Sequence, residues 1–147
     1  MKPEEYRRLF ENVRKRPGMY LIHGDFATVV AFVAGCDTSG LLTGFREWLV
    51  TRVGCGDNLV WWALVVRLVA PPDGQHPGKL DAATDARAVA MLFACLDEFL
   101  RLRSEPGGLE RIHAAHSAWI AARQRDGCQA TEAARCPAVE WPRPSAT

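Results

Sequence analysis

The sequence predicts an all-α protein, a compact bundle of five or six short helices with a disordered C-terminal tail. Three observations support this fold class. Apolar residues recur with the spacing of one helix face, glycine and proline interrupt that pattern at lengths typical of globular helices, and no stretch alternates as a strand ladder would. A chain of 147 residues can bury one core. We therefore expect one helical domain, residues 1–126, and a flexible tail, residues 127–147, where prolines and small residues follow no periodic pattern.

The first helix is expected over residues 3–15, where apolar residues fall at helical spacing: Tyr6, Leu9, Phe10 and Val13. It should end at Arg16, since the residue before a proline is disfavoured in helical space. Pro17 and Gly18 suit the two central positions of a type II turn. We expect this turn to reverse the chain and to pin the next four residues to the hydrophobic interior: Met19, Tyr20, Leu21 and Ile22.

Three further helices are expected before the middle of the chain. Asp25 can cap a second helix that runs to Ala34, followed by Gly35 as a stop. A third helix is predicted over residues 41–53, although Gly44 weakens it. A fourth is predicted over residues 59–70, capped by Asp57 or Asn58. Because that segment is apolar all round, we expect it to be the central helix.

The second half of the chain contains the two longest predicted helices. Proline and glycine make residues 71–81 a loop. A helix over residues 83–103 then presents a continuous apolar seam, and Pro106, Gly107 and Gly108 break it. The last helix is expected over residues 109–125, with Leu109, Ile112, Trp119 and Ile120 on one face.

Composition and charge exclude several classes of partner. Eighteen lysine and arginine residues are offset by seventeen aspartate and glutamate residues, so a net charge of +1 provides no global field that would attract nucleic acid or an anionic membrane. The apolar run of residues 59–70 is too short for a membrane span, which needs about twenty residues. Charged residues near the start do not resemble a secretory signal. We expect a cytoplasmic protein with no membrane partner.

The five cysteines include no Cys-x-x-Cys pair, so neither a disulfide framework nor a familiar zinc site is expected, and most should be reduced thiols. Glu110, His113 and His116 share a helix face that resembles metal-binding bundles, but no second helix offers a partner histidine. We expect half-buried histidines at a helix interface and no metal, cofactor or catalytic residue. A small enzyme that depends on a metal or a thiol, using His113 and His116 with Cys36 or Cys55, remains an alternative.

A second alternative is a nucleic-acid-associated regulator. Five cations in and just after the first helix could contact phosphates: Arg7, Arg8, Arg14, Lys15 and Arg16. Tyr6 and Tyr20, which lie near them in the sequence, could stack on bases. Glutamates of the same helix reduce the local excess of positive charge, so a solvated helix face explains the cluster as well. Nucleic acid is therefore not the expected partner.

The segment Val13–Leu21, VRKRPGMYL, resembles a short segment near the start of the ATPase domain of DNA gyrase B. Those ATPases also need a metal-binding asparagine on the following helix and an Asp-x-Gly-x-Gly loop. The stretch FATVVAFVAGCD lacks that asparagine, and no Asp-x-Gly-x-Gly occurs in the chain. ATPase activity is therefore not expected.

A longer resemblance covers residues 4–100. Small bacterial proteins that look like this begin with a helix, continue with Arg-Pro-Gly-Met-Tyr-Leu, and carry four further motifs that this chain has at Phe32–Gly35, Phe45–Leu49, Trp61 and Leu96–Phe99. In this chain Ile22-His23-Gly24 replaces the usual glycine after Tyr-Leu, which indicates a shifted turn.

Such proteins resemble immunity proteins of polymorphic toxin systems. The resemblance implies a module that binds a cognate toxin domain and occludes its active site, with no catalysis of its own. Tryptophan and arginine are favoured at interfaces, and loops commonly carry binding residues. The expected contact residues are therefore Arg14, Arg16, Trp61, Trp62, Asp73, His76 and Lys79. The sequence leaves the oligomeric state open.

Overall fold

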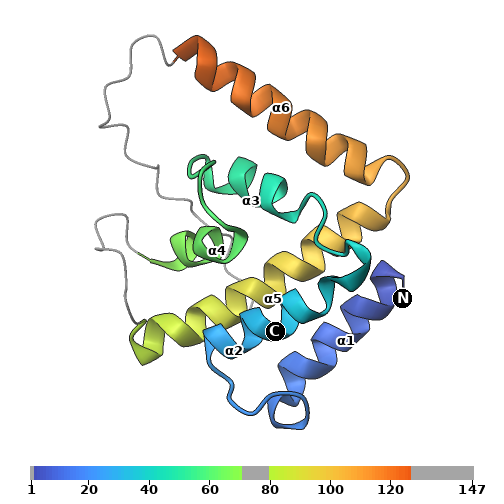
Figure 1. The fold of residues 1–147 in the computed structure, drawn as a ribbon, viewed down its shortest axis with the longest axis vertical. Coiled ribbons are helices and arrows are strands. Elements are labelled where there is room, and N and C mark those ends of the chain that lie inside the picture. Colours follow the sequence, from blue (N-terminus) through green and yellow to red (C-terminus); the bar gives the residue numbers. More distant parts are fainter. Residues whose placement is uncertain (1, 71–79, 127–147) are drawn as a thin grey trace, which may run out of the picture.

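A computed structural model describes residues 2–70 and 80–126 of the chain, and within them it contains six α-helices and no strand, which confirms the all-α prediction (Figure 1). The predicted tail, most of the predicted 71–81 loop, and the candidate residues Asp73, His76 and Lys79 lie outside the described residues. The helices are α1 (Pro3–Lys15), α2 (Phe26–Gly35), α3 (Phe45–Val53), α4 (Trp61–Val69), α5 (Ala82–Ser104) and α6 (Gly108–Asp126), with short 3-10 helices at η1 (Pro17–Met19) and η2 (Asp37–Ser39).

The central helix is α5. It packs against α1, α2, α4 and α6, and Figure 1 shows it crossing the molecule between them. Its length agrees with the prediction to within one residue at each end, because the apolar seam continues without interruption. Residues on several sides of α5 are fully buried, among them Ala88, Leu92, Cys95, Leu96, Phe99 and Leu100. This helix therefore supplies the surface on which the other elements assemble.

The expectation that the fourth helix would be central is wrong. Only Leu64 and Val65 of α4 are buried, whereas Trp62 and Arg67 are exposed. The helix begins at Trp61 after Val60, and no side chain caps it, so Asp57 and Asn58 are not its cap. A helix of nine residues that covers one side of α5 needs only one apolar stripe. Its other apolar side chains pack against the edge of the core and stay partly exposed, apart from Trp62, which lies at the surface.

Helix α2 begins as the sequence predicts. Asp25 accepts hydrogen bonds from Thr28 N at 3.0 Å and from Thr28 Oγ1 at 2.8 Å. A second carboxylate completes the cap, since Phe26 N donates to the two Oδ atoms of Asp85 in α5 at 3.1 and 3.2 Å. Two of the orphan N–H groups of α2 are thereby satisfied, one locally and one by the central helix.

Helix α3 begins four residues later than predicted, at Phe45. Gly44 precedes it with a φ of 87°, in the left-handed region that favours glycine. A Cβ atom at this position would lie 2.8 Å from Leu109 Cδ1 of α6. Residues 41–44 therefore form a turn that lets α6 approach the backbone closely, and the buried Leu41 and Leu42 reach the core from that turn.

Candidate protein interface at the corner between α1 and α2

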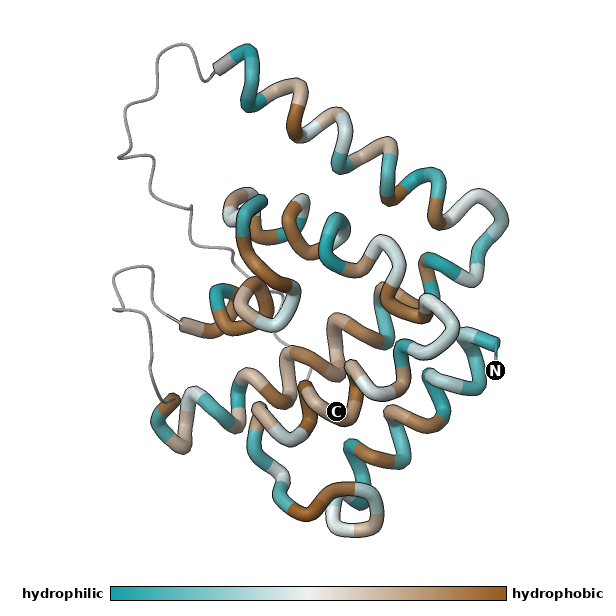
Figure 2. The backbone as a smooth tube through the Cα atoms, viewed as in Figure 1, coloured by the Kyte–Doolittle hydropathy of each residue, from teal (hydrophilic) through white to brown (hydrophobic). Residues whose placement is uncertain are grey.

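The connection between α1 and α2 does not place its apolar residues as the sequence indicated. Of the four residues expected in the interior, only Leu21 is buried. Met19 is 72% exposed, Tyr20 40% and Ile22 91%. The prediction was wrong because a tight turn directs successive side chains in different directions, so a single one of them reaches the core. We call Met19, Tyr20 and Ile22 the apolar corner, and Figure 2 shows a hydrophobic stretch in this connection at the edge of the molecule.

The backbone of the corner is hydrogen-bonded. The predicted type II turn is replaced by the 3-10 helix η1, in which Tyr20 N and Leu21 N donate to Pro17 O at 2.9 and 2.8 Å. Gly18 is not in the left-handed region that a type II turn requires. Since Leu21 is buried on one side and Asp85 holds the start of α2 on the other, the exposed side chains stand on an anchored backbone.

Positive charge borders the apolar corner. Arg14 Nη2 and Lys15 Nζ lie 2.9 and 3.1 Å from the same oxygen of Glu11, Oε1. Hydrogen bonds from Arg14 and then from Lys15 lower the pKa of Glu11 to about 2. Arg16 is exposed, and its side chain forms no ion pair within the described part of the chain. Two of the three consecutive cations thus share one carboxylate, and the third adds a further positive charge, which leaves the corner with an excess of positive charge.

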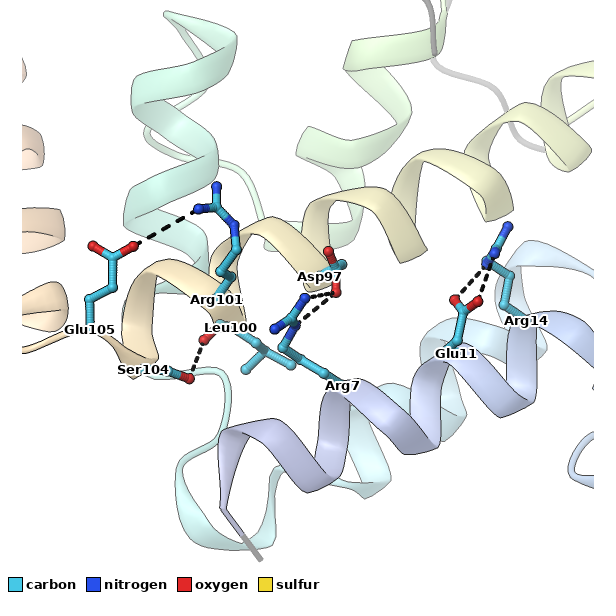
Figure 3. Close-up of polar contacts among 8 residues, drawn as sticks. All are labelled: Arg7, Glu11, Arg14, Asp97, Leu100, Arg101, Ser104 and Glu105. Carbon is cyan, nitrogen blue, oxygen red and sulfur yellow. Dashed lines mark hydrogen bonds and ion pairs between the residues drawn. The ribbon is translucent and has the colours of Figure 1, made fainter. Parts of the chain in front are cut away.

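Arg7, another member of the N-terminal basic cluster, is paired with a carboxylate of the central helix, whereas Arg8 is exposed. Arg7 Nε and Nη2 contact Asp97 Oδ1 of α5 at 2.8 and 2.7 Å, so this cation joins two helices (Figure 3). Tyr6 is buried and packs beside Phe10, with ring centroids 6.2 Å apart. A buried Tyr6 has no ring face to offer to a base.

The two adjacent tryptophans point in different directions, one inward and one outward. Trp61 is half-buried, with its ring centroid 5.7 Å from that of Phe45 in α3. Trp62 meets Trp61 edge-on at 5.5 Å and is 42% exposed, next to Val60 at 45%. Trp61 therefore contributes to the interior, and Trp62 with Val60 forms a second, smaller exposed apolar surface.

The histidine face of α6 is only partly as predicted. His113 and Glu110 are exposed, so the expectation of a half-buried His113 is wrong. His116 is half-buried, as expected: its Nε2 lies 3.2 Å from Asp57 Oδ1, and its ring stacks on Trp119 with centroids 6.1 Å apart. Within residues 2–70 and 80–126, no three histidine, cysteine, aspartate or glutamate side chains gather in a group that suits a metal ion.

The described cysteines differ in state. Cys36 and Cys95 are free thiols, as expected. Burial raises the pKa of Cys36, and burial raises the pKa of Cys95 to about 12, so both stay protonated at neutral pH. Cys55 is disulfide-bonded, so it is not among the reduced thiols that the sequence predicts for most of the cysteines. An alternative that uses Cys55 as a thiol loses its nucleophile.

Of the expected contact residues that the structure describes, Arg14 and Arg16 border the apolar corner, whereas Trp61 and Trp62 belong to α4. The corner residues themselves were missed, because the sequence assigned them to the core. One signal could have pointed to them: Ile22 stands directly before His23-Gly24-Asp25, where polar residues and a glycine indicate a solvent-facing connection.

No helix of the described ranges has both the length and the apolar character that a membrane span requires. In the comparisons with known proteins, no family model, no curated protein and no solved structure matches this chain.

Proposed function

We propose that this chain is a protein-binding module, an immunity protein that neutralises a cognate toxin domain by occluding its active site. The observation that carries the proposal is the exposure of Met19, Tyr20 and Ile22 on a hydrogen-bonded turn. These residues lie in or directly after Arg16–Leu21, the segment on which the resemblance to immunity proteins rests.

Energetics favour this surface as an anchor. Burying a side chain such as Met or Ile contributes about 1.5–3 kcal/mol, and a few such anchors commonly dominate an interface. Because the backbone of the turn is already ordered, little conformational entropy is lost when the corner docks. Arg14, Lys15 and Arg16 would orient the approach of a partner that carries acidic residues around an apolar pocket.

The mechanism is steric. A protein that fills or covers the cleft of a toxin excludes its substrate, and it needs no reactive group of its own. We propose accordingly that the chain is not an enzyme and that it acts in the cytoplasm. There it would bind the toxin before the toxin reaches its substrates.

The test uses the reading frame adjacent to this gene. Its C-terminal domain is produced in cells with the wild-type chain, with Ile22→Asp, or with Val60→Asp. The control variant changes an exposed apolar residue of similar size at the N-cap of α4, where aspartate is favoured. We expect the wild type and Val60→Asp to restore growth and to co-purify with the domain, and Ile22→Asp to do neither. Loss of protection by Val60→Asp alone would place the interface on α4. Absence of both protection and complex with the wild type would refute the proposal.

A further inference from the structure

A shallow groove continues from the apolar corner along α1 and α5. It consists of two adjoining hollows, of about 210 and 260 Å³, that share Arg14, Ala90 and Phe93. The first hollow reaches Pro17 and Leu21 at the corner, and the second reaches Arg7 and Asp97. The two helices lie side by side and antiparallel, since the start of α1 meets the later part of α5. We call this feature the α1/α5 groove.

The floor of the groove is apolar and close to the helix backbone. Ala86, Ala90 and Ala94 are exposed and recur every four residues along α5, so they form a row on one helix face. Side chains that end at Cβ let a third helix come near, within the 8–10 Å axis separation of packed helices. Phe93 and Val13 close the groove below this row. From Ala86 to Ala94 the row spans a little over two helical turns, roughly 12 Å.

The walls restrict the backbone conformation of an occupant. Both walls are α-helices, whose N–H and C=O groups are bonded within each helix. An extended strand laid in the groove would find no backbone partners, and its own polar groups would lose water without compensation. The backbone N–H and C=O groups of a helix are bonded within the helix itself, so a helix can lie in such a groove without losing hydrogen bonds.

Polar groups of the groove indicate where charge on the occupant belongs. Along the groove, both cations form ion pairs with carboxylates: Arg7 pairs with Asp97 at 2.7 Å, and Arg14 pairs with Glu11 at 2.9 Å (Figure 3). A neutral or apolar face can lie over these pairs without leaving a charge uncompensated. At the corner end, Lys15 shares Glu11 with Arg14, and Arg16 has no ion pair within the described residues. Acidic side chains on the occupant are favoured there.

We propose that the α1/α5 groove binds an amphipathic α-helix of the toxin domain over about two turns, with small or apolar residues facing the alanine row and aspartate or glutamate at the end that reaches Arg16. This inference rests on the proposed function, and it extends the interface from the corner to the groove. The corner would fill the toxin's cleft while the groove holds a helix beside that cleft.

The test measures the affinity of the purified chain for the purified domain of the adjacent reading frame. Ala90→Arg places a long charged side chain in the groove, and Ala114→Arg makes the same change at an exposed alanine of α6. Both positions are helical, so both variants should fold, which circular dichroism and thermal melting check. We expect Ala90→Arg to weaken binding about tenfold or more, and Ala114→Arg to leave it unchanged.

Four other outcomes would contradict the groove proposal. If Ala90→Arg binds as the wild type does while Ile22→Asp does not, the groove is not part of the interface and the proposed function stands. If the wild type does not bind, both proposals fail. A concentration-dependent dimer of the free protein that Ala90→Arg abolishes would identify a second copy as the occupant. If Ala90→Arg accelerates hydrogen exchange in residues 127–147 of the free protein, the chain's own C-terminal segment is the occupant of the groove.

Discussion

Asp85 of α5 accepts the first backbone N–H of α2, that of Phe26, with its two carboxylate oxygens at 3.1 and 3.2 Å. These residues are 59 positions apart in sequence. The contact fixes the start of α2 to the central helix, and it thereby holds the far end of the turn that displays Met19, Tyr20 and Ile22. Local and long-range capping together keep this connection in place.

Replacing Asp85 with alanine should lower the free energy of unfolding by about 1–2 kcal/mol, because a helix cap is lost and a backbone donor at the start of α2 is left without a partner. Asp97→Ala is the matched control on the same helix. It removes an exposed ion pair with Arg7, which is worth about 0–1 kcal/mol. Urea unfolding of the two variants measures both changes. Equal losses would mean that the cap contributes nothing beyond a surface charge.

Gly44→Ala should destabilise the protein by about 1–3 kcal/mol. The substitution strains a backbone at φ 87° and brings a Cβ to 2.8 Å from Leu109 Cδ1. Gly18→Ala is the control, because nothing lies within 4 Å of the added atom and its φ is outside the left-handed region. Denaturant midpoints provide the comparison. A Gly44→Ala variant as stable as Gly18→Ala would show that the approach of α6 to this turn is not tight.

Stability should fall in acid through two aspartates that cap helices: Asp25 at the start of α2 and Asp81 at the start of α5. The pKa of Asp25 is lowered by hydrogen bonds from Thr28, and that of Asp81 by hydrogen bonds from Thr84. A carboxylate whose pKa is lower in the folded state stabilises that state above its unfolded pKa, near 3.8, and loses this contribution as the pH falls through the folded pKa. Asparagine can still cap but does not titrate in this range. Asp25→Asn with Asp81→Asn should therefore flatten the dependence of unfolding free energy on pH below about 4. An unchanged slope would contradict the assignment.

Cys95 should resist alkylation in the folded protein. It is fully buried, and burial raises its pKa to about 12, so the reactive thiolate is scarce at pH 8. Iodoacetamide labelling followed by peptide mass spectrometry should find Cys95 unmodified in the native protein and modified in urea. Similar labelling rates under the two conditions would show that α5 opens readily in the native state.

Strong local signals made much of the fold predictable. Helix α1 has the predicted bounds because its apolar spacing, its first-turn proline and the Arg16-Pro17 stop all agree. The ends of α5 and α6 were each predicted to within one residue for similar reasons. Where the prediction failed, a distant contact had decided the outcome. At the start of α3, Gly44 was a local sign of a weak helix, but its left-handed backbone and the close approach of Leu109 of α6 became evident only in the folded structure.

The candidate site was harder to predict than the fold. Four consecutive apolar residues follow the Pro17-Gly18 turn, and the sequence predicted that all four would pin the chain to the interior. A turn directs consecutive side chains to different sides, so only Leu21 is buried. The cap that Asp85 provides and the pair of Arg7 with Asp97 join distant segments, so they too required the folded structure.

Photo-crosslinking from the apolar corner tests the central claim most directly. A photoreactive amino acid replaces Met19 in one variant and Ala114 of α6 in the other, and each is produced with the domain of the adjacent reading frame. Both positions are exposed, so irradiation should form an adduct with that domain wherever it lies within reach. The account predicts an adduct from position 19 and none from position 114. An adduct from position 114 alone, or none from either position, would contradict it.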